Sequence, residues 1–178
     1  EMAQRRLGIG TTRDGILCWA SSSEQTVNIP NRQHLIRTQE TQIMSHVTGR
    51  CLCGGIRFRV RLPTLWCVHC HCSMCRTTHG AAFVTWFGVP EEAFALTSND
   101  DDLGWYQSSP EAKRGFCNRC GTSLLFKSSR WEGEMHVTLA NVQQPIDRSP
   151  SAHVYYDTHV DWIQLTDDLP RFDDAPSV

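Results

Sequence analysis

Closely spaced cysteines are the feature of this sequence that most restricts what the chain can fold into. Seven of the nine cysteines fall into three short clusters: Cys51-Leu52-Cys53-Gly54, Cys70-His71-Cys72-Ser73-Met74-Cys75 and Cys117-Asn118-Arg119-Cys120-Gly121. A tetrahedral zinc ion with Zn–S bonds of about 2.3 Å needs sulfurs a little under about 4 Å apart, and cysteines separated by one or two residues in a turn meet this requirement. The clusters therefore predict metal-binding turns.

Cysteine usage also bears on the cellular compartment. Nine cysteines in 178 residues is about 5%, which is below the roughly 8–10% of short secreted disulfide scaffolds. The apolar run Ile16–Ala20 is shorter than the roughly 7–15 residues of a signal-peptide core. We therefore expect a reducing, cytoplasmic location, where close cysteines are metal ligands or redox pairs before they are disulfides.

The number of cysteines in each cluster separates two kinds of site. A structural zinc is closed by four protein ligands, whereas a catalytic zinc holds three and keeps a fourth position for water or substrate. We assign the outer pairs to a structural zinc: Cys51, Cys53, Cys117 and Cys120. We assign the middle cluster to an open, catalytic zinc: Cys70, Cys72 and Cys75. Two zinc ions per chain are predicted.

Two alternatives compete with this assignment. Cys67 lies three residues before Cys70 and could close a second four-thiolate site, which would make the protein a non-catalytic zinc-stapled binding module. The Cys-x-x-Cys spacing is also that of a dithiol redox motif, but that motif is expected near a βαβ pattern, which this chain lacks. His69, His71 and His79 are alternative ligands or groups that donate to the ligands.

The charge of a three-thiolate site favours one reaction class. Three thiolates on a divalent cation leave a net charge near −1, which weakens the metal as a Lewis acid and disfavours water activation. The same metal can hold an incoming thiol deprotonated, and the electron-rich ligand set leaves that sulfur nucleophilic. Thiol transfer or thiol addition is the predicted chemistry.

The remainder of the sequence predicts a mainly β fold. Residues 56–62 alternate apolar residues with arginines, which is the period of a half-buried strand. Further strands are predicted: Ala82–Phe87, Lys113–Phe116, Ser123–Lys127, Met135–Leu139, His153–Tyr156 and Trp162–Leu165. We expect one domain at residues 46–173, an atypical or poorly structured extension at 1–45, a solvated acidic loop at Asn99–Asp102 and a tail at 174–178.

Charge and hydropathy exclude some partners. Seventeen Lys and Arg against nineteen Asp and Glu give a net charge of −2 with no basic cluster, so we expect no nucleic-acid partner. No stretch approaches the roughly 18 apolar residues of a membrane helix, so we expect no membrane partner.

Longer motifs around the cysteines resemble a known family. They are Gly49-Arg50-Cys51-Leu52-Cys53-Gly54-Gly55, Cys70-His71-Cys72-Ser73-Met74-Cys75-Arg76 and Gly115-Phe116-Cys117-Asn118-Arg119-Cys120-Gly121-Thr122. These motifs are similar to those of the glutathione-dependent formaldehyde-activating enzymes, a family that includes centromere protein V. The similarity continues to Leu169-Pro170-Arg171-Phe172, so it covers roughly residues 47–172.

The resemblance implies a fold, a cofactor set and an activity. It implies a β-tent fold of small antiparallel sheets with a structural and a catalytic zinc on the cysteines assigned above. It implies a carbon–sulfur lyase that forms S-(hydroxymethyl)glutathione from formaldehyde and glutathione, with glutathione as the small-molecule partner. A lyase or transferase acting on a different thiol adduct is the alternative. Five residues are candidates for substrate contact, although solvated charge or core packing is their expected role: Arg76, His79, Trp86, Lys113 and Arg114.

Overall fold

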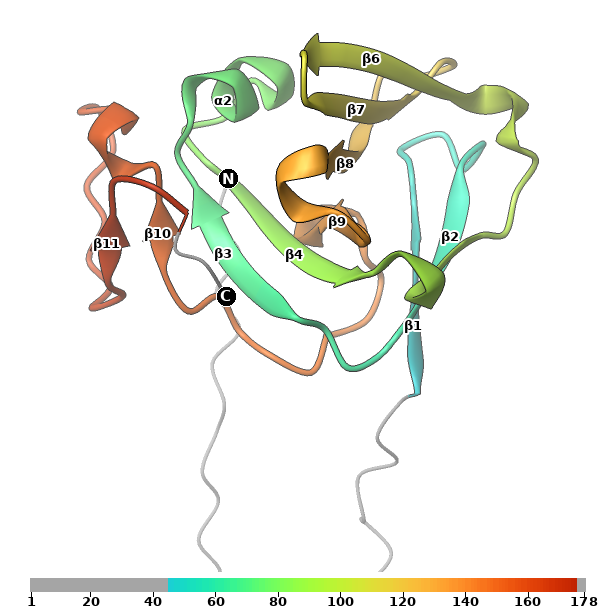
Figure 1. Ribbon diagram of the computed structural model, residues 1–178, viewed down its shortest axis with the longest axis horizontal. Helices are drawn as coiled ribbons and strands as arrows, with labels where there is room; N and C mark the ends of the chain where they lie inside the picture. Colours follow the sequence, from blue (N-terminus) through green and yellow to red (C-terminus); the bar gives the residue numbers. More distant parts are fainter. Residues whose placement is uncertain (1–44, 176–178) are drawn as a thin grey trace, which may run out of the picture. The chain divides into compact units, whose positions relative to one another are not determined.

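The computed structural model describes residues 45–175 (Figure 1). The strands are β1 His46–Arg50, β2 Arg57–Arg61, β3 Trp66–Cys70, β4 Val84–Pro90, β5 Phe94–Leu96, β6 Leu103–Ser109, β7 Ala112–Cys117, β8 Ser123–Ser128, β9 Glu134–Thr138, β10 His153–Val154 and β11 Arg171–Phe172. The helices are α2 Ser73–His79 and the short 3-10 helices η1 Glu91–Ala93, η2 Asp100–Asp102, η3 Ser129–Trp131, η4 Leu139–Asn141 and η5 Tyr156–Thr158. The predicted extension lies almost entirely outside the described residues, so its boundary stays a prediction.

The strands form two sheets, which confirms the mainly β prediction. One sheet has three strands in the order β1-β2-β5, and the other has eight in the order β11-β10-β3-β4-β9-β8-β7-β6. All pairs are antiparallel except those that β10 makes with β3 and with β11. The paired strands bring together segments that are far apart in the sequence, since β3 lies between β4 and β10.

The main core is built from alternating side chains of both sheets. In β2 the burial pattern alternates, with Phe58 and Val60 buried and the three arginines exposed. These side chains share one cluster with Phe87 of β4, Leu125 of β8 and Val137 of β9. Burying a side chain of this size stabilises the fold by about 1.5–3 kcal/mol. The alternation seen in the sequence is therefore the cause of the contact between the two sheets.

The prediction of a strand at Trp162–Leu165 is wrong. This segment forms turns and bends, and the Trp162 side chain is 67% exposed. Gln164 interrupts its apolar residues, and within residues 45–175 the segment pairs with no strand of either sheet, so local propensity alone does not produce a strand here. The structure also contains β1, β3, β5, β6, β11 and the seven-residue α2, none of which was predicted. The strand predicted at His153–Tyr156 is limited to the two residues of β10, because η5 begins at Tyr156. The acidic segment before β6 is exposed as expected, although it includes η2.

Strand β3 separates two cores. Cys67 belongs to the main core, whereas Cys70 belongs to a smaller cluster with Trp86 and Val154. Residues three apart in a strand point to opposite faces, which explains the division. Figure 1 shows α2 at the end of β3, on the same side as β6 and β7. This arrangement places the end of β3 beside a separate cluster of aromatic side chains.

Candidate functional site

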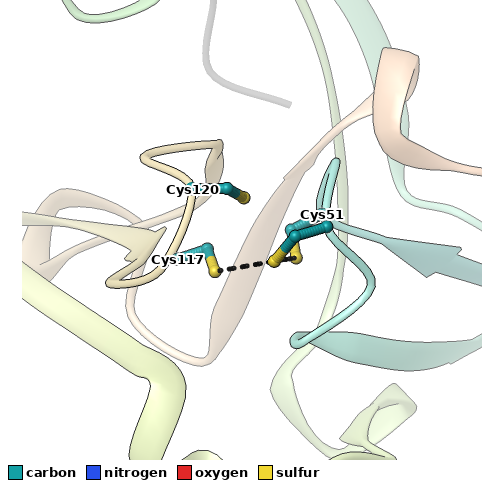
Figure 2. Close-up of side chains that lie close together, drawn as sticks. Cys51, Cys117 and Cys120 are labelled. Carbon is teal, nitrogen blue, oxygen red and sulfur yellow. Dashed lines mark hydrogen bonds between the residues drawn. The ribbon is translucent and has the colours of Figure 1, made fainter.

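The outer cysteine pairs form one compact group, here called the clamp: Cys51, Cys53, Cys117 and Cys120. Their sulfur atoms all lie within 4.8 Å of one another. The Sγ atoms of Cys51 and Cys53 are 3.5 Å apart, and those of Cys53 and Cys117 are 3.8 Å apart. Figure 2 shows the Cys117 and Cys120 side chains directed towards Cys51.

Two similar turns produce this geometry. Cys51 follows β1 and Cys117 ends β7. In each turn the glycine after the second cysteine has a positive φ, +76° at Gly54 and +72° at Gly121, a conformation that side chains disfavour. The amide of each glycine donates to the carbonyl of the first cysteine, over 3.1 Å at Gly54 and 2.8 Å at Gly121. The glycines therefore allow each turn to direct two thiols to one point.

The clamp joins the two sheets, because β1 belongs to the three-stranded sheet and β7 to the eight-stranded one. Local donors favour the thiolate forms of Cys51 and Cys120, whereas burial raises the pKa of Cys117 to about 11. The Ile56 amide donates to Cys51 Sγ over 3.2 Å, and the Thr122 hydroxyl lies 3.2 Å from Cys120 Sγ. The hydrogen bond with Thr122 contributes most to lowering the pKa of Cys120 to about 5.

The middle cysteines form a second group, here called the open site: Cys70, Cys72 and Cys75. Their sulfurs also lie within 4.8 Å of one another, and those of Cys70 and Cys75 are 3.7 Å apart. Cys70 ends β3, Cys72 caps α2 and Cys75 lies in its first turn. Cys72 accepts the Cys75 amide over 3.3 Å. Hydrogen bonds from Cys70 and Cys75 lower the pKa of Cys72 strongly.

Cys67 does not join the open site. Its side chain is fully buried in the main core, opposite Phe87 in the pairing of β3 with β4. Burial raises the pKa of the Cys67 thiol to about 11, which keeps it protonated. The alternative of a four-thiolate second site therefore finds no support in the geometry.

A buried arginine lies against the open site. Arg114 of β7 is 4% exposed, and its Nη1 donates to Cys75 Sγ over 3.6 Å. Its guanidinium also stacks on Phe126. Within residues 45–175 Arg114 makes no ion pair with a carboxylate. Because a buried charge needs a partner, Arg114 indicates that the open site carries negative charge.

A chain of polar groups supports the segment between Cys70 and Cys72. His71 Nε2 lies 2.8 Å from His153 Nδ1, and His153 Nε2 lies 3.0 Å from Asp167. His71 and His153 are both buried. Burial lowers the pKa of His71 to about 4, so its ring is neutral at pH 7. This chain fixes the His71 ring and with it the backbone that carries two of the thiols.

A pocket of about 340 Å³ opens beside the three thiols. Its walls include the open-site cysteines, Arg114 and several aromatic side chains, among them Trp66, Trp86 and Phe126. The clamp cysteines are not among its lining residues. The structure thus places one thiol group against a ligand-sized cavity and the other in a closed connection between sheets.

The substrate-contact candidates have different surroundings. Arg114 and Trp86 line the pocket, although solvated charge and core packing were the roles expected of these two candidates. Arg76 Nε instead donates to the His71 carbonyl over 3.0 Å. Lys113 lies over the Trp105 ring, and His79 packs edge-on against Trp86. Trp66 and Phe126 were not among the predicted substrate-contact residues. They reach the pocket through the strand register of the eight-stranded sheet.

The two thiol groups fit zinc. Tetrahedral Zn–S bonds of about 2.3 Å imply sulfur separations of about 3.8 Å. Three of the sulfur pairs are 3.5, 3.7 and 3.8 Å apart, and all sulfurs of each group lie within 4.8 Å of one another. None of the cysteines in the described part of the chain forms a disulfide. Cys51 and Cys117 of the clamp are buried, and a metal ion would provide a shared partner for all four of its sulfurs.

The fold and the site define a mainly β protein with two cysteine groups of metal-binding geometry, one closed and one facing a pocket. A family profile described as glutathione-dependent formaldehyde-activating enzyme matches residues 46–158. The chain belongs to this family, as its motifs indicated.

Relatives agree with this membership. A protein of Halomonas elongata named for the same enzyme family is 27% identical over 125 residues, which are 66% of this chain and 79% of that protein. A protein of Schizosaccharomyces pombe named as an uncharacterised lyase is 37% identical over 90 residues, 47% of this chain and 58% of the relative. Membership and the lyase name support an enzyme with glutathione-related chemistry.

A solved structure shares the fold. The crystal structure of a Rhodobacter sphaeroides protein matches with a TM-score of 0.50 at 20% identity, over 70% of this chain and 98% of that one. No helix in the described range, residues 45–175, has the length and apolar character needed to cross a membrane.

Proposed function

We propose that the protein is a zinc-dependent carbon–sulfur lyase that acts on glutathione adducts, as in the formation of S-(hydroxymethyl)glutathione from formaldehyde and glutathione. The observation that carries the proposal is the difference between the two thiol groups. The clamp has four thiols, none of which lines the pocket, whereas the open site has three thiols that do. This is the distinction between a structural and a catalytic zinc site.

The proposed roles follow from this difference. The clamp cysteines hold a structural ion that ties the two sheets together. Cys70, Cys72 and Cys75 would hold the second ion. A zinc ion bound there would act as a Lewis acid that keeps the sulfur of an incoming thiol deprotonated at neutral pH. The pocket admits the substrate on the side that the protein leaves free.

The surrounding residues prepare the site for an anionic sulfur. Arg114 offsets negative charge on the thiolates and orients Cys75. The apolar walls exclude water, which strengthens electrostatic interactions within the pocket. In the proposed reaction the sulfur attacks the aldehyde carbon, the C–S bond forms, and the carbonyl oxygen takes up a proton. Holding the two reactants together supplies most of the acceleration.

Exchange NMR on formaldehyde, glutathione and their adduct tests the proposal. We expect the zinc-loaded protein to accelerate exchange and the Cys72→Ser variant not to do so, while its melting temperature stays within a few degrees of that of the unmodified protein. Buffer with the same total zinc is one control. Cys67→Val is the matched cysteine control, because Cys67 lies outside both thiol groups.

Two results would contradict the proposal. Equal acceleration by Cys72→Ser and the unmodified protein would show that the open site does not carry the reaction. No acceleration by any of these proteins, with two zinc ions bound per chain, would show that formaldehyde and glutathione are not the reactants.

A further inference from the structure

The pocket beside the open site is larger and more apolar than a one-carbon aldehyde requires. Its volume is about 340 Å³, within the range of roughly 300–1,000 Å³ typical of ligand sites. Formaldehyde contributes a single carbon beside the sulfur. A pocket of this size therefore has room for a much larger group next to the reacting atoms.

The pocket walls present aromatic faces. Trp66, Trp86, Phe126 and Trp131 all line the cavity. The Phe126 ring packs against two of these tryptophans. Its centroid lies 6.1 Å from that of Trp86 and 6.2 Å from that of Trp131. Aromatic side chains in such contact form a continuous apolar surface that favours another ring.

Several polar atoms of these walls already have partners, whereas the buried Nε of Arg114 has none among the described residues. Glu134 accepts from Trp66 Nε1 over 2.9 Å and lies 3.0 Å from His136 Nε2. At the rim, Arg130 is paired with Asp174. Within the described residues Arg114 is therefore the one buried cation of the pocket without a carboxylate partner, and it lies against Cys75.

This distribution disfavours a pocket filled by the peptide part of glutathione. That peptide carries carboxylates and an ammonium group, and burying them without partners costs several kcal/mol each. The exposed rim residues Glu111 and Arg130 can meet such groups in water. The charged part of a substrate thus belongs at the rim, and the interior suits an apolar group.

We propose that the pocket binds thiol adducts in which an aromatic or similarly bulky apolar group is attached at the sulfur-bearing carbon, an inference that rests on the proposed thiol-adduct chemistry of the open site. The reaction is the addition of a thiol to an aromatic aldehyde and its reverse. In the forward direction the S–C bond forms, the C=O π pair moves to oxygen, and that oxygen takes the proton the thiol lost. Elimination breaks the S–C bond and returns aldehyde and thiol, with no oxidant or reductant.

Calorimetric titration of the full, zinc-loaded chain with stable thioethers tests this. S-benzylglutathione and S-methylglutathione differ only by the ring. Burying that ring is expected to make S-benzylglutathione bind at least about tenfold more tightly. A second pair, benzyl mercaptan and 2-mercaptoethanol, shows whether the apolar group enters from the thiol side instead. A preference for S-benzylglutathione supports the inference, whereas a preference found only in the benzyl mercaptan pair would place the apolar group on the thiol and overturn it.

Matched tryptophan variants locate the binding. Trp131→Ala, on the pocket wall, is expected to reduce the benzyl preference several-fold. Trp105→Ala, on β6 and outside the pocket, is expected to leave it unchanged. Circular dichroism on both variants verifies the fold. A loss of preference in Trp105→Ala equal to that in Trp131→Ala would overturn the assignment to this pocket.

The formaldehyde exchange measurement on the same preparations separates the two proposals. Equal affinity for both members of each pair, together with accelerated formaldehyde exchange, would overturn this inference and leave the proposed function standing. A clear benzyl preference without formaldehyde exchange would support the inference and reject formaldehyde as the reactant.

Discussion

Arg114 Nη1 donates a hydrogen bond to Cys75 Sγ over 3.6 Å, although the two residues come from different elements, β7 and α2. Arg114 is buried and stacks on Phe126. The contact places a fixed positive charge beside three thiols. Three thiolates and a divalent cation sum to −1, so the guanidinium would bring the centre close to neutrality.

Replacing Arg114 tests this charge compensation. Arg114→Met removes the donor to Cys75 and should weaken zinc binding at the open site by about 10- to 100-fold, the usual effect of losing a group that hydrogen-bonds a metal ligand. The affinity is measured from zinc release to a colorimetric chelator, in which the open site and the clamp are expected to release their ions in separate phases. Lys113→Met is the control, since Lys113 is exposed and lies over Trp105. Similar release from both variants would contradict the role.

The two thiol groups should differ in their effect on stability. Cys117→Ser should lower the melting temperature strongly, because a structural zinc contributes its binding free energy to folding. Cys75→Ser should remove one zinc per chain and leave the melt largely intact. Thermal melts by circular dichroism and zinc content by mass spectrometry check both. Equal destabilisation by the two changes would show that the division into a clamp and an open site is wrong.

The position of Cys67 predicts that it binds no metal. Cys67→Val should cost less than about 1.5 kcal/mol, as for other swaps of similar volume in a core, and should retain two zinc ions per chain. Cys70→Val, on the opposite face of β3, should lose one. Urea unfolding and zinc content measure the two effects. Loss of an ion from the Cys67 variant would establish it as a ligand.

Glu134 should make stability depend on acid pH. Hydrogen bonds from His136 and then Trp66 lower its pKa below the usual 4.5. A carboxylate with a lowered folded-state pKa stabilises the protein above the unfolded pKa, and this contribution is lost as the pH falls through the folded pKa. Glu134→Gln should therefore cost about 1.5 kcal/mol at pH 7 and progressively less below pH about 4.5.

Urea unfolding across this pH range checks the Glu134 prediction. The difference between Glu134→Gln and the unmodified protein cancels the protonation of groups that do not contact Glu134, the cysteines among them. Glu132→Gln, at an exposed neighbouring position, is the control and should show no such trend. A Glu134→Gln difference that stays constant with pH would reject the assigned carboxylate role.

The cysteine spacing was sufficient to predict both thiol groups. Pairs one or two residues apart are constrained by local turn geometry, and Gly54 and Gly121 marked the turns. The open site is also local, because Cys70, Cys72 and Cys75 lie within one strand end and one helical turn. Whether these thiols hold zinc stays a prediction, since geometry alone does not identify the ion.

The pocket could not be predicted in the same way. Trp66, Phe126 and Arg114 are on β3, β8 and β7, and only the register of the eight-stranded sheet brings them together. The register depends on contacts between strands that are distant in the sequence, and a local sequence pattern does not contain this information. The same reason explains the missed β6, whose sequence LGWYQSS has weak alternation.

Strand β7 has a further consequence for how the protein would respond to a shortage of zinc. Its end carries Cys117 of the clamp, and its middle carries Arg114, which reaches the open site. The clamp and the open site therefore both depend on the position of β7. If the clamp empties, the strand loses its anchor and the guanidinium loses its fixed position, so we expect the vacancy to be transmitted to the pocket. Loss of the clamp ion is therefore expected to weaken the pocket together with the fold.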